Sequence, residues 1–156
     1  MTDAQRTFRP EPDAWSPLMV LDHLVRVEGG VLWGLGRQLS AGDRRRDVGT
    51  PTDAGMQRLR DALTSGERRR VPETASRVIP TGEATLADLR AEWDGYDARW
   101  RETLGAVPDS LRETGLLLHP IAGAMTAEGG AEFVAGHIEH HTRQLDRIEA
   151  ADGYPA

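Results

Sequence analysis

Three of the five histidines in this 156-residue chain lie close together, in the run His137-Ile138-Glu139-His140-His141. A helix advances by about 100° per residue, so His137 and His141 share a face with apolar residues while His140 points toward the flank. Side chains four residues apart on a helix have Cβ atoms about 5–6 Å apart, so both imidazoles can reach one ion. The pair therefore predicts a metal site on the core-facing side of a helix. The apolar residues of that face are Val134, Ile138, Leu145 and Ile148.

The alternative is that both histidines are ordinary core residues, hydrogen-bonded to backbone groups or to buried water. Unpaired polar rings in a core cost on the order of 1–3 kcal/mol each, and a metal ion would relieve both at once. A single inward histidine would favour the ordinary interpretation, whereas two on one face favour the metal. The HxxxH spacing alone is a weak motif, because helices often place histidines in this way by chance.

A third ligand can come from the first predicted helix, where His23 lies at the edge of the apolar face beside Val20 and Val27. Taken alone, His23 would be an unremarkable boundary histidine, and its interest comes from the pair that it could complete. Asp22 and Glu28 are candidates for a fourth or supporting ligand, although solvated surface charge is the more ordinary role for either. Three histidines would leave coordination positions open to water or substrate, which is the catalytic pattern.

The absence of several known motifs excludes other kinds of functional site. The chain has no cysteine, so disulfides and thiolate ligands are excluded. HExxH is absent, and no acidic residue stands three positions before His137, His140 or His141, which excludes a zincin site and a carboxylate-bridged di-iron bundle. No glycine-rich nucleotide loop and no Gly-x-Ser-x-Gly motif occurs. The remaining chemistry is a histidine-held ion that acts as a Lewis acid or lowers the pKa of a bound water or thiol.

Charge and hydropathy exclude some partners. The net charge is −6, with the charges scattered, which disfavours nucleic acid because nucleic acid requires a basic face. The first residues lack the apolar region of a signal peptide. No apolar run approaches the roughly 20 residues that span a bilayer. We therefore expect a cytoplasmic protein that acts on a small molecule, without a nucleic-acid or membrane partner.

Four helical segments are expected to position these residues. Ser16 is a good N-cap, followed by proline at the first helical position, and the first helix should cover about 17–39. A weaker helix fits 52–64, a third should cover about 85–104, and the last should cover about 126–151. The sequence therefore predicts an all-α fold, an antiparallel four-helix bundle.

The predicted bundle has long inter-helix loops and one domain. The loops at 65–82 and 105–125 are longer than bundle connections usually are, and long loops tend to be functional or disordered. Within the second loop, the leucines at 116–118 predict a short extended segment. Residues 1–13 are polar and proline-containing, so we expect a flexible N-terminal lead before a single domain at 14–156.

The predicted ligand-bearing helices contain several glycines. Each glycine costs up to about 1 kcal/mol relative to alanine in a helix interior. For Gly30 and Gly136, two interpretations weigh about evenly: compositional drift, or a functional role, which is either a close approach of the two ligand-bearing helices or room for a substrate. For the other helical glycines we favour drift.

Three separated blocks, in order along nearly the whole chain, are similar to blocks of a known family. The first is Trp15-Ser16-Pro17 followed by Leu21-Asp22-His23-Leu24. The second is His119-Pro120 followed by Ala124-Met125-Thr126-Ala127. The third is a His-x-x-His-His-x-x-Gln-hydrophobic pattern over 137–145. The chain thus resembles the DinB superfamily, in which a tryptophan precedes the first ligand-bearing helix.

The resemblance implies a DinB-like four-helix bundle of up-down-down-up topology that holds one divalent metal ion. The ligands map onto His23, His137 and His141. His140 maps to a position that is not usually a ligand, in agreement with the helical-face argument, and His119 is also left out of the ligand set. Zinc is the favoured ion, with nickel, iron or manganese as alternatives. A homodimer is expected from the resemblance alone.

The resemblance also implies a class of reaction. Characterised relatives include thiol-dependent S-transferases and isomerases that use mycothiol or bacillithiol as a low-molecular-weight thiol cosubstrate. The functional hypotheses are a metal-dependent enzyme such as a thiol S-transferase or a hydrolase, a non-catalytic stress-related metal-binding protein, or a structural bundle without metal. The chain has Gly129-Gly130 and Gly136 where the family often has bulkier residues, so the identity of the substrate is not carried over.

Overall fold

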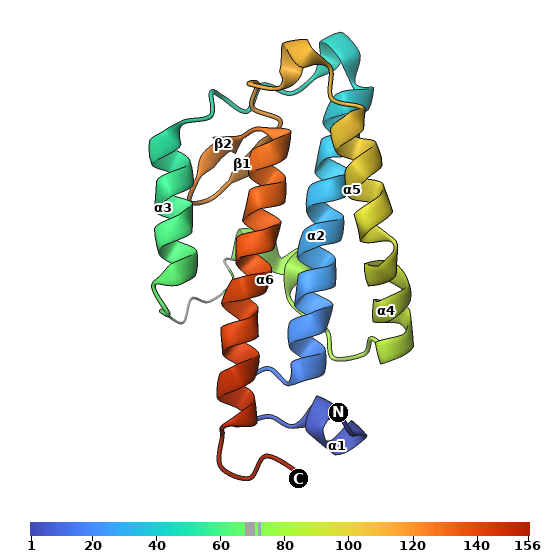
Figure 1. Ribbon diagram of the computed structural model, residues 1–156, viewed down its shortest axis with the longest axis vertical. Helices are drawn as coiled ribbons and strands as arrows, with labels where there is room; N and C mark the ends of the chain where they lie inside the picture. Colours follow the sequence, from blue (N-terminus) through green and yellow to red (C-terminus); the bar gives the residue numbers. More distant parts are fainter. Residues whose placement is uncertain (68–70, 72) are drawn as a thin grey trace.

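The computed structural model of the protein describes residues 1–67, 71 and 73–156, and it is mostly helical with a small two-stranded sheet (Figure 1). Within these residues, no helix has the length and apolar character needed to cross a membrane. The elements are α1 (Asp3–Thr7), α2 (Pro17–Ser40), η1 (Gly42–Arg44), α3 (Asp53–Thr64), η2 (Glu73–Val78), α4 (Leu86–Asp94), α5 (Tyr96–Gly105), η3 (Asp109–Leu111), β1 (Leu117–His119), β2 (Gly123–Met125) and α6 (Ala127–Glu149).

The helices α2, α3, α4 and α6 begin next to the hydroxyl residues expected from the sequence. The side-chain oxygens of Ser16, Thr52, Thr85 and Thr126 each accept a hydrogen bond from the backbone N–H three residues further on. Each bond satisfies one of the free N–H groups at a helix start. The predicted helix starts are therefore confirmed.

The third predicted helix is divided into α4 and α5 at Gly95, which lacks a side-chain cap and adopts φ −82° and ψ −15°. Glycine weakens a helix because its backbone is the most flexible. The extended segment expected near residues 116–118 is strand β1, which pairs antiparallel with β2. Helix η2 lies in the predicted loop 65–82, of which residues 68–70 and 72 lie outside the described part of the chain.

Helices α2 and α6 lie side by side, with α3 next to α6 and with α4 and α5 next to α2 (Figure 1). Apolar contacts show the directions of these helices. The start of α6 packs near the end of α2 through Ala127 and Leu35, and its end packs near the start of α2 through Ile148 and Val20. The two helices therefore run antiparallel.

Successive long helices alternate in direction, whereas the resemblance implied an up-down-down-up order (Figure 1). Helix α5 runs parallel to α2, because Leu104 near its end packs against the cluster that contains Leu35. Helix α3 runs parallel to α6, because Leu63 near its end accepts a hydrogen bond from His140. The connection from α3 to α4 does not carry the chain to the opposite end of the molecule, since residues 78–81 are bonded to the first half of α2.

Several glycines lie where elements pack closely, among them Gly130 of α6, whose added Cβ would lie 3.4 Å from Val31 of α2. A Cβ on Gly30 would meet nothing within 4 Å, and one on Gly136 would lie 3.1 Å from Leu63 of α3. The tightest approach is at Gly55 of α3, where a Cβ would lie 2.1 Å from the carbonyl oxygen of Ala122. Gly30 and Gly136 therefore do not lie at a close approach of α2 and α6, which was one of the interpretations weighed for them, whereas Gly55 allows α3 to pack closely on the hairpin of β1 and β2.

The first residues contain a helix that the composition did not predict. Helix α1 begins with a capping box, in which the side chains of Thr2 and Gln5 bond to each other's backbone N–H. Gln5 Nε2 also donates to the carbonyl oxygen of Pro155, and the ring of Phe8 lies 5.4 Å from that of Tyr154. The two ends of the chain therefore contact each other, while the flexibility expected for residues 1–13 stays a prediction.

Candidate metal centre

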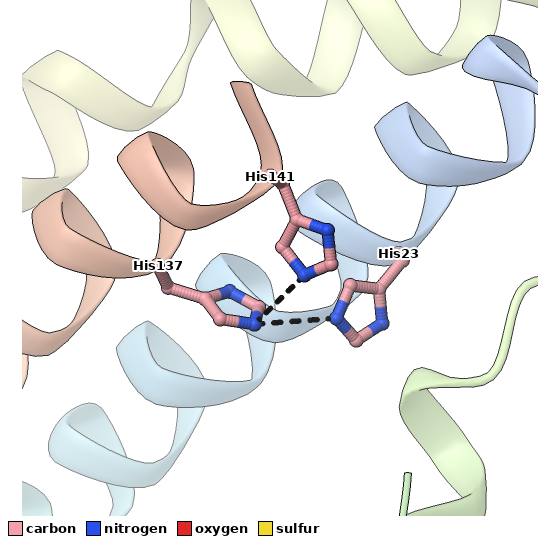
Figure 2. Close-up of side chains that lie close together, drawn as sticks. All are labelled: His23, His137 and His141. Carbon is pink, nitrogen blue, oxygen red and sulfur yellow. Dashed lines mark hydrogen bonds between the residues drawn. The ribbon is translucent and has the colours of Figure 1, made fainter. Parts of the chain in front are cut away.

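The structure brings His23, His137 and His141 together, with their rings turned toward one point between α2 and α6 (Figure 2). The Nε2 atom of His137 lies 3.4 Å from Nε2 of His23 and 3.1 Å from Nε2 of His141. The candidate ligand atoms of the three residues all lie within 4.8 Å of one another. These are the three predicted metal ligands. His23 and His137, whose Nε2 atoms are within hydrogen-bonding distance, are 114 residues apart in the sequence.

Two of these histidines are held by hydrogen bonds on the opposite side of the ring. The Nδ1–H of His23 donates to the carbonyl oxygen of Val78 at 2.7 Å, and the Nδ1–H of His141 donates to Oε1 of Gln144 at 2.7 Å. A carbonyl oxygen can only accept, so each ring carries its proton on Nδ1. The Nε2 lone pairs of His23 and His141 therefore point toward the centre, as in histidines that bind metals.

The three inward Nε2 atoms share too few protons to satisfy one another by hydrogen bonds. In the neutral state, only His137 can carry a proton on its inward nitrogen. Its single N–H can point at His23 or at His141, but one N–H does not satisfy two separate lone pairs well. At least one inward lone pair therefore has no good donor, and a cation at the centre would engage all three nitrogens at once.

Burial lowers the pKa of all three imidazoles, because an apolar environment disfavours the charged form. The pKa of His141 falls to about 4 through burial and the nearby His23 ring. The pKa of His137 falls to about 2 through burial and the neighbouring His141 and His23 rings. For His23, burial outweighs the Val78 carbonyl, so its pKa is also lowered. All three are therefore neutral near pH 7, which is the form that binds a metal ion.

Aromatic rings flank the histidines on two sides. The ring of Trp15 lies 4.9 Å from that of His23 and stacks at 6.4 Å on that of His141. The ring of Phe133 lies 5.2 Å from that of His137. These contacts restrict the planes of the imidazoles, so the positions of the inward nitrogens are set by packing as well as by hydrogen bonds.

The remaining two histidines have other bonding partners. The Nδ1–H of His140 donates to the carbonyl oxygen of Leu63 at 2.9 Å, at the end of α3. The Nδ1 atom of His119 accepts the backbone N–H groups of Ile121 and Ala122 in the turn of the hairpin. Neither residue belongs to the histidine cluster.

The two acidic residues of α2 are buried, contrary to the expected solvated surface charge. Asp22 is 3% exposed, and Glu28 is 7% exposed. Glu28 accepts a hydrogen bond from Nε1 of Trp100 at 2.7 Å, and burial raises the pKa of its carboxyl group. Their burial escaped prediction because Trp100, which bonds to Glu28, and Thr81, which bonds to Asp22, lie far away in the sequence. Neither carboxylate belongs to the histidine cluster.

Supporting groups were harder to foresee than the histidines. Gln144 lies three residues after His141 and borders the same helical face, so its position in the sequence was a signal for this bond. The carbonyl of Val78 gave no signal, since any residue carries a carbonyl and the bond to His23 spans 55 residues.

Comparison with known proteins gave one match. The family model described as the DinB superfamily matches residues 1–145, a range that includes all three clustered histidines. No curated protein matches the chain, and no solved structure matches it.

Proposed function

The chain belongs to the DinB superfamily, and on this premise we propose that it binds one divalent metal ion through Nε2 of His23, His137 and His141. The observation that carries the proposal is the pair of Nδ1 hydrogen bonds that direct two lone pairs toward a third imidazole nitrogen. Zinc is the ion that we favour, with nickel, iron or manganese as alternatives, since three neutral imidazoles suit each of them. We also propose that α2, α3, α4–α5 and α6 form a four-helix bundle of this family.

A bound ion would supply a Lewis acid that lowers the pKa of a coordinated water or thiol. Three protein ligands leave coordination positions for such a group. The residues of the chain hold the ligands ready for this role. Val78 and Gln144 orient two of the imidazoles, and Trp15 and Phe133 pack against their rings.

Metal binding is tested by loading purified protein with zinc, removing the excess and measuring bound metal by mass spectrometry. We expect about one ion per chain for the wild type and none for the His137→Ala, His141→Ala double variant. His140→Ala is the matched control, because His140 lies on the same helix but bonds to Leu63 instead. If the folded wild type holds no more metal than the double variant, the proposal is wrong.

A finer proposal is a thiol-dependent S-transferase that uses mycothiol or bacillithiol on a small-molecule electrophile. Its support is the resemblance to characterised relatives, together with the open coordination positions of a three-histidine site. In such a transfer the thiol loses its proton, its sulfur bonds to the electrophile, and the leaving group departs with the electrons of the broken bond. The thiolate is the attacking species, so a lowered thiol pKa would accelerate the reaction.

The transfer is tested by incubating metal-loaded protein with bacillithiol or mycothiol and monochlorobimane. Displacement of chloride by the thiol makes the product fluorescent. We expect a rate above the background that is lost in His23→Ala and kept in His140→Ala. A wild type that binds metal but gives no rate above background would favour a non-catalytic metal-binding protein over a transferase.

The oligomeric state and the binding partners of the protein are the subject of a separate proposal. We propose a homodimer that acts on a small molecule in the cytoplasm, without a nucleic-acid or membrane partner. The dimer is supported by the resemblance, and light scattering tests it. The expected result is a particle of twice the mass of one chain, and a monomer at high concentration would contradict the proposal.

A further inference from the structure

Two consecutive residues of α2 hold the two ends of one short segment of the chain. The Nδ1–H of His23 donates to the carbonyl oxygen of Val78 at 2.7 Å. The backbone N–H of Thr81 donates to Oδ2 of Asp22 at 3.2 Å. Residues 78–81 are therefore bonded at their first residue to a candidate metal ligand and at their last residue to its neighbour.

The carboxylate of Asp22 is itself fixed in place. Its side chain is 4% exposed, and its second oxygen, Oδ1, accepts a hydrogen bond from Nε of Arg26 at 2.6 Å. Both oxygens of the buried group are thus occupied, one by a side chain of the same helix and one by the 78–81 segment. A carboxylate held in this way fixes the distance between Thr81 and α2.

The position of Thr81 limits the position of Val78. Only Ile79 and Pro80 lie between them, and Pro80 is buried. Proline holds its φ angle near −65°, so the connection has little freedom. The Val78 carbonyl is the group that keeps the proton of His23 on Nδ1, so a displaced segment would allow the proton to move to Nε2, the nitrogen that must bind the ion.

We propose that Asp22 is a positioning residue of the metal centre, which acts through Thr81 and the Val78 carbonyl to keep the Nε2 lone pair of His23 directed at the ion. Asp22 does not belong to the histidine cluster, and its carboxylate is bonded to Arg26 and Thr81. The inference rests on the proposed metal binding for its functional consequence. Its structural part, control of the His23 tautomer, applies to the metal-free protein and can be measured there.

The test compares His23 in metal-free wild type and Asp22→Ala. Long-range ¹H–¹⁵N NMR spectra of protein labelled with ¹⁵N-histidine at pH 7.5 distinguish the two tautomers. We expect the Nδ1–H form alone in the wild type and a mixture of both forms in Asp22→Ala. Zinc affinity, measured by competition with a chromophoric chelator, should fall by about 10–100-fold, as is typical when a group that orients a ligand is lost.

Three further variants separate positioning from a general loss of stability. Asp22→Asn keeps an oxygen that accepts the Thr81 N–H, so it should restore the Nδ1–H tautomer. Arg26→Ala removes the ion pair but leaves the bond between Asp22 and Thr81, so it should change the tautomer less than Asp22→Ala does. Asp97→Ala breaks a matched i, i+4 pair with Arg101 on the surface of α5 and should leave both the tautomer and the zinc affinity unchanged.

Each result decides the proposal. A folded Asp22→Ala protein that keeps the wild-type tautomer overturns it, as does wild-type zinc affinity in that variant. If Asp22→Ala does not fold, Thr81→Pro removes the N–H donor together with the hydroxyl that accepts from the Glu83 N–H, and Thr81→Ala is the control for the lost hydroxyl. Thr81→Pro must produce the same mixture of tautomers, and Thr81→Ala must not. If the wild type binds no zinc, the proposed function is wrong, but the tautomer spectra still show whether Asp22 positions His23.

Discussion

At the scale of single residues, the hydrogen bonds on the outer nitrogens matter as much as the histidines themselves. His23 and His141 are each held by an acceptor on Nδ1, from Val78 in the first case and from Gln144 in the second. One acceptor belongs to the backbone and the other to a side chain. Only the side-chain acceptor can be removed by a simple substitution, which makes Gln144 the direct test of this arrangement.

Gln144→Leu keeps the size of the side chain but removes the acceptor for His141. We expect zinc affinity to fall by about 10–100-fold, because the ring loses the bond that selects its tautomer. Chelator competition measures the change. Gln57→Leu on the surface of α3 is the matched control and should bind zinc as the wild type does. Equal affinities of the two variants would show that Gln144 does not orient the ligand.

The lowered pKa values of His137 and His141 predict how stability depends on pH. In the unfolded chain both imidazoles bind protons below about pH 6.5, whereas in the folded, metal-free protein they stay neutral to about 2 and about 4. The unfolded state therefore binds more protons, and the free energy of unfolding falls as the pH drops below 6.5. The limiting slope is about 1.4 kcal/mol per pH unit for each group.

Urea unfolding of metal-free protein at pH 7.5 and pH 5.5 tests this dependence. We expect a lower midpoint at pH 5.5 for the wild type and a smaller difference for the His137→Ala, His141→Ala variant. A wild type that is equally stable at both pH values would mean that the imidazoles titrate normally in the folded state.

At the scale of elements, the packing of α3 on the hairpin of β1 and β2 closes one side of the core. Leu59 of α3 lies in the same buried cluster as Ala122 of the hairpin and Phe133 of α6. Phe133 in turn contacts the ring of His137. The packing of α3 therefore reaches the candidate metal centre through one aromatic side chain.

Gly55→Ala should disturb this contact, since its Cβ would lie 2.1 Å from the backbone carbonyl oxygen of Ala122. The backbone cannot move aside freely, so we expect a loss of about 1–3 kcal/mol in the free energy of unfolding, measured in urea. Gly36→Ala is the matched control, because its Cβ would meet nothing within 4 Å in α2. It should stabilise the protein by up to about 1 kcal/mol. A neutral Gly55→Ala would contradict the tight packing.

At the scale of the whole molecule, the two ends of the chain contact each other. Phe8, Trp15 and Tyr154 pack against one buried cluster that contains Val20 and Ile148. Trp15 also contacts His23 and His141. The contact between the termini therefore supports the tryptophan that packs on the candidate ligands.

Tyr154→Ala removes the edge-to-face contact with Phe8. Such aromatic pairs contribute about 0.5–1.5 kcal/mol beyond the area that they bury, so we expect a loss of at least about 1 kcal/mol. For a chain of this size that corresponds to a fall of about 2–4 °C in Tm, measured by calorimetry. Tyr154→Phe keeps the ring and should unfold near the wild-type temperature. If both variants unfold with the wild type, the contact between the termini adds no stability.

The sequence by itself determined the features that depend on near neighbours. Ser16, Thr52 and Thr126 cap helices through bonds to residues three positions away, and the helical period alone puts His137 and His141 on one face. These features follow from local geometry, which a window of a few residues contains. The break at Gly95 is also local, but glycine only weakens a helix and so does not by itself predict where one ends.

Only the tertiary structure decided which distant groups meet. The antiparallel packing of α2 and α6 brings His23 to His137, and the position of η2, which ends at Val78, brings the Val78 carbonyl to His23. The same packing buries Asp22, for which the sequence favoured a solvated position, and sets the alternating direction of the helices. Periodicity shows which face of a helix is apolar, but not which helix covers it, because that depends on the packing of the whole core.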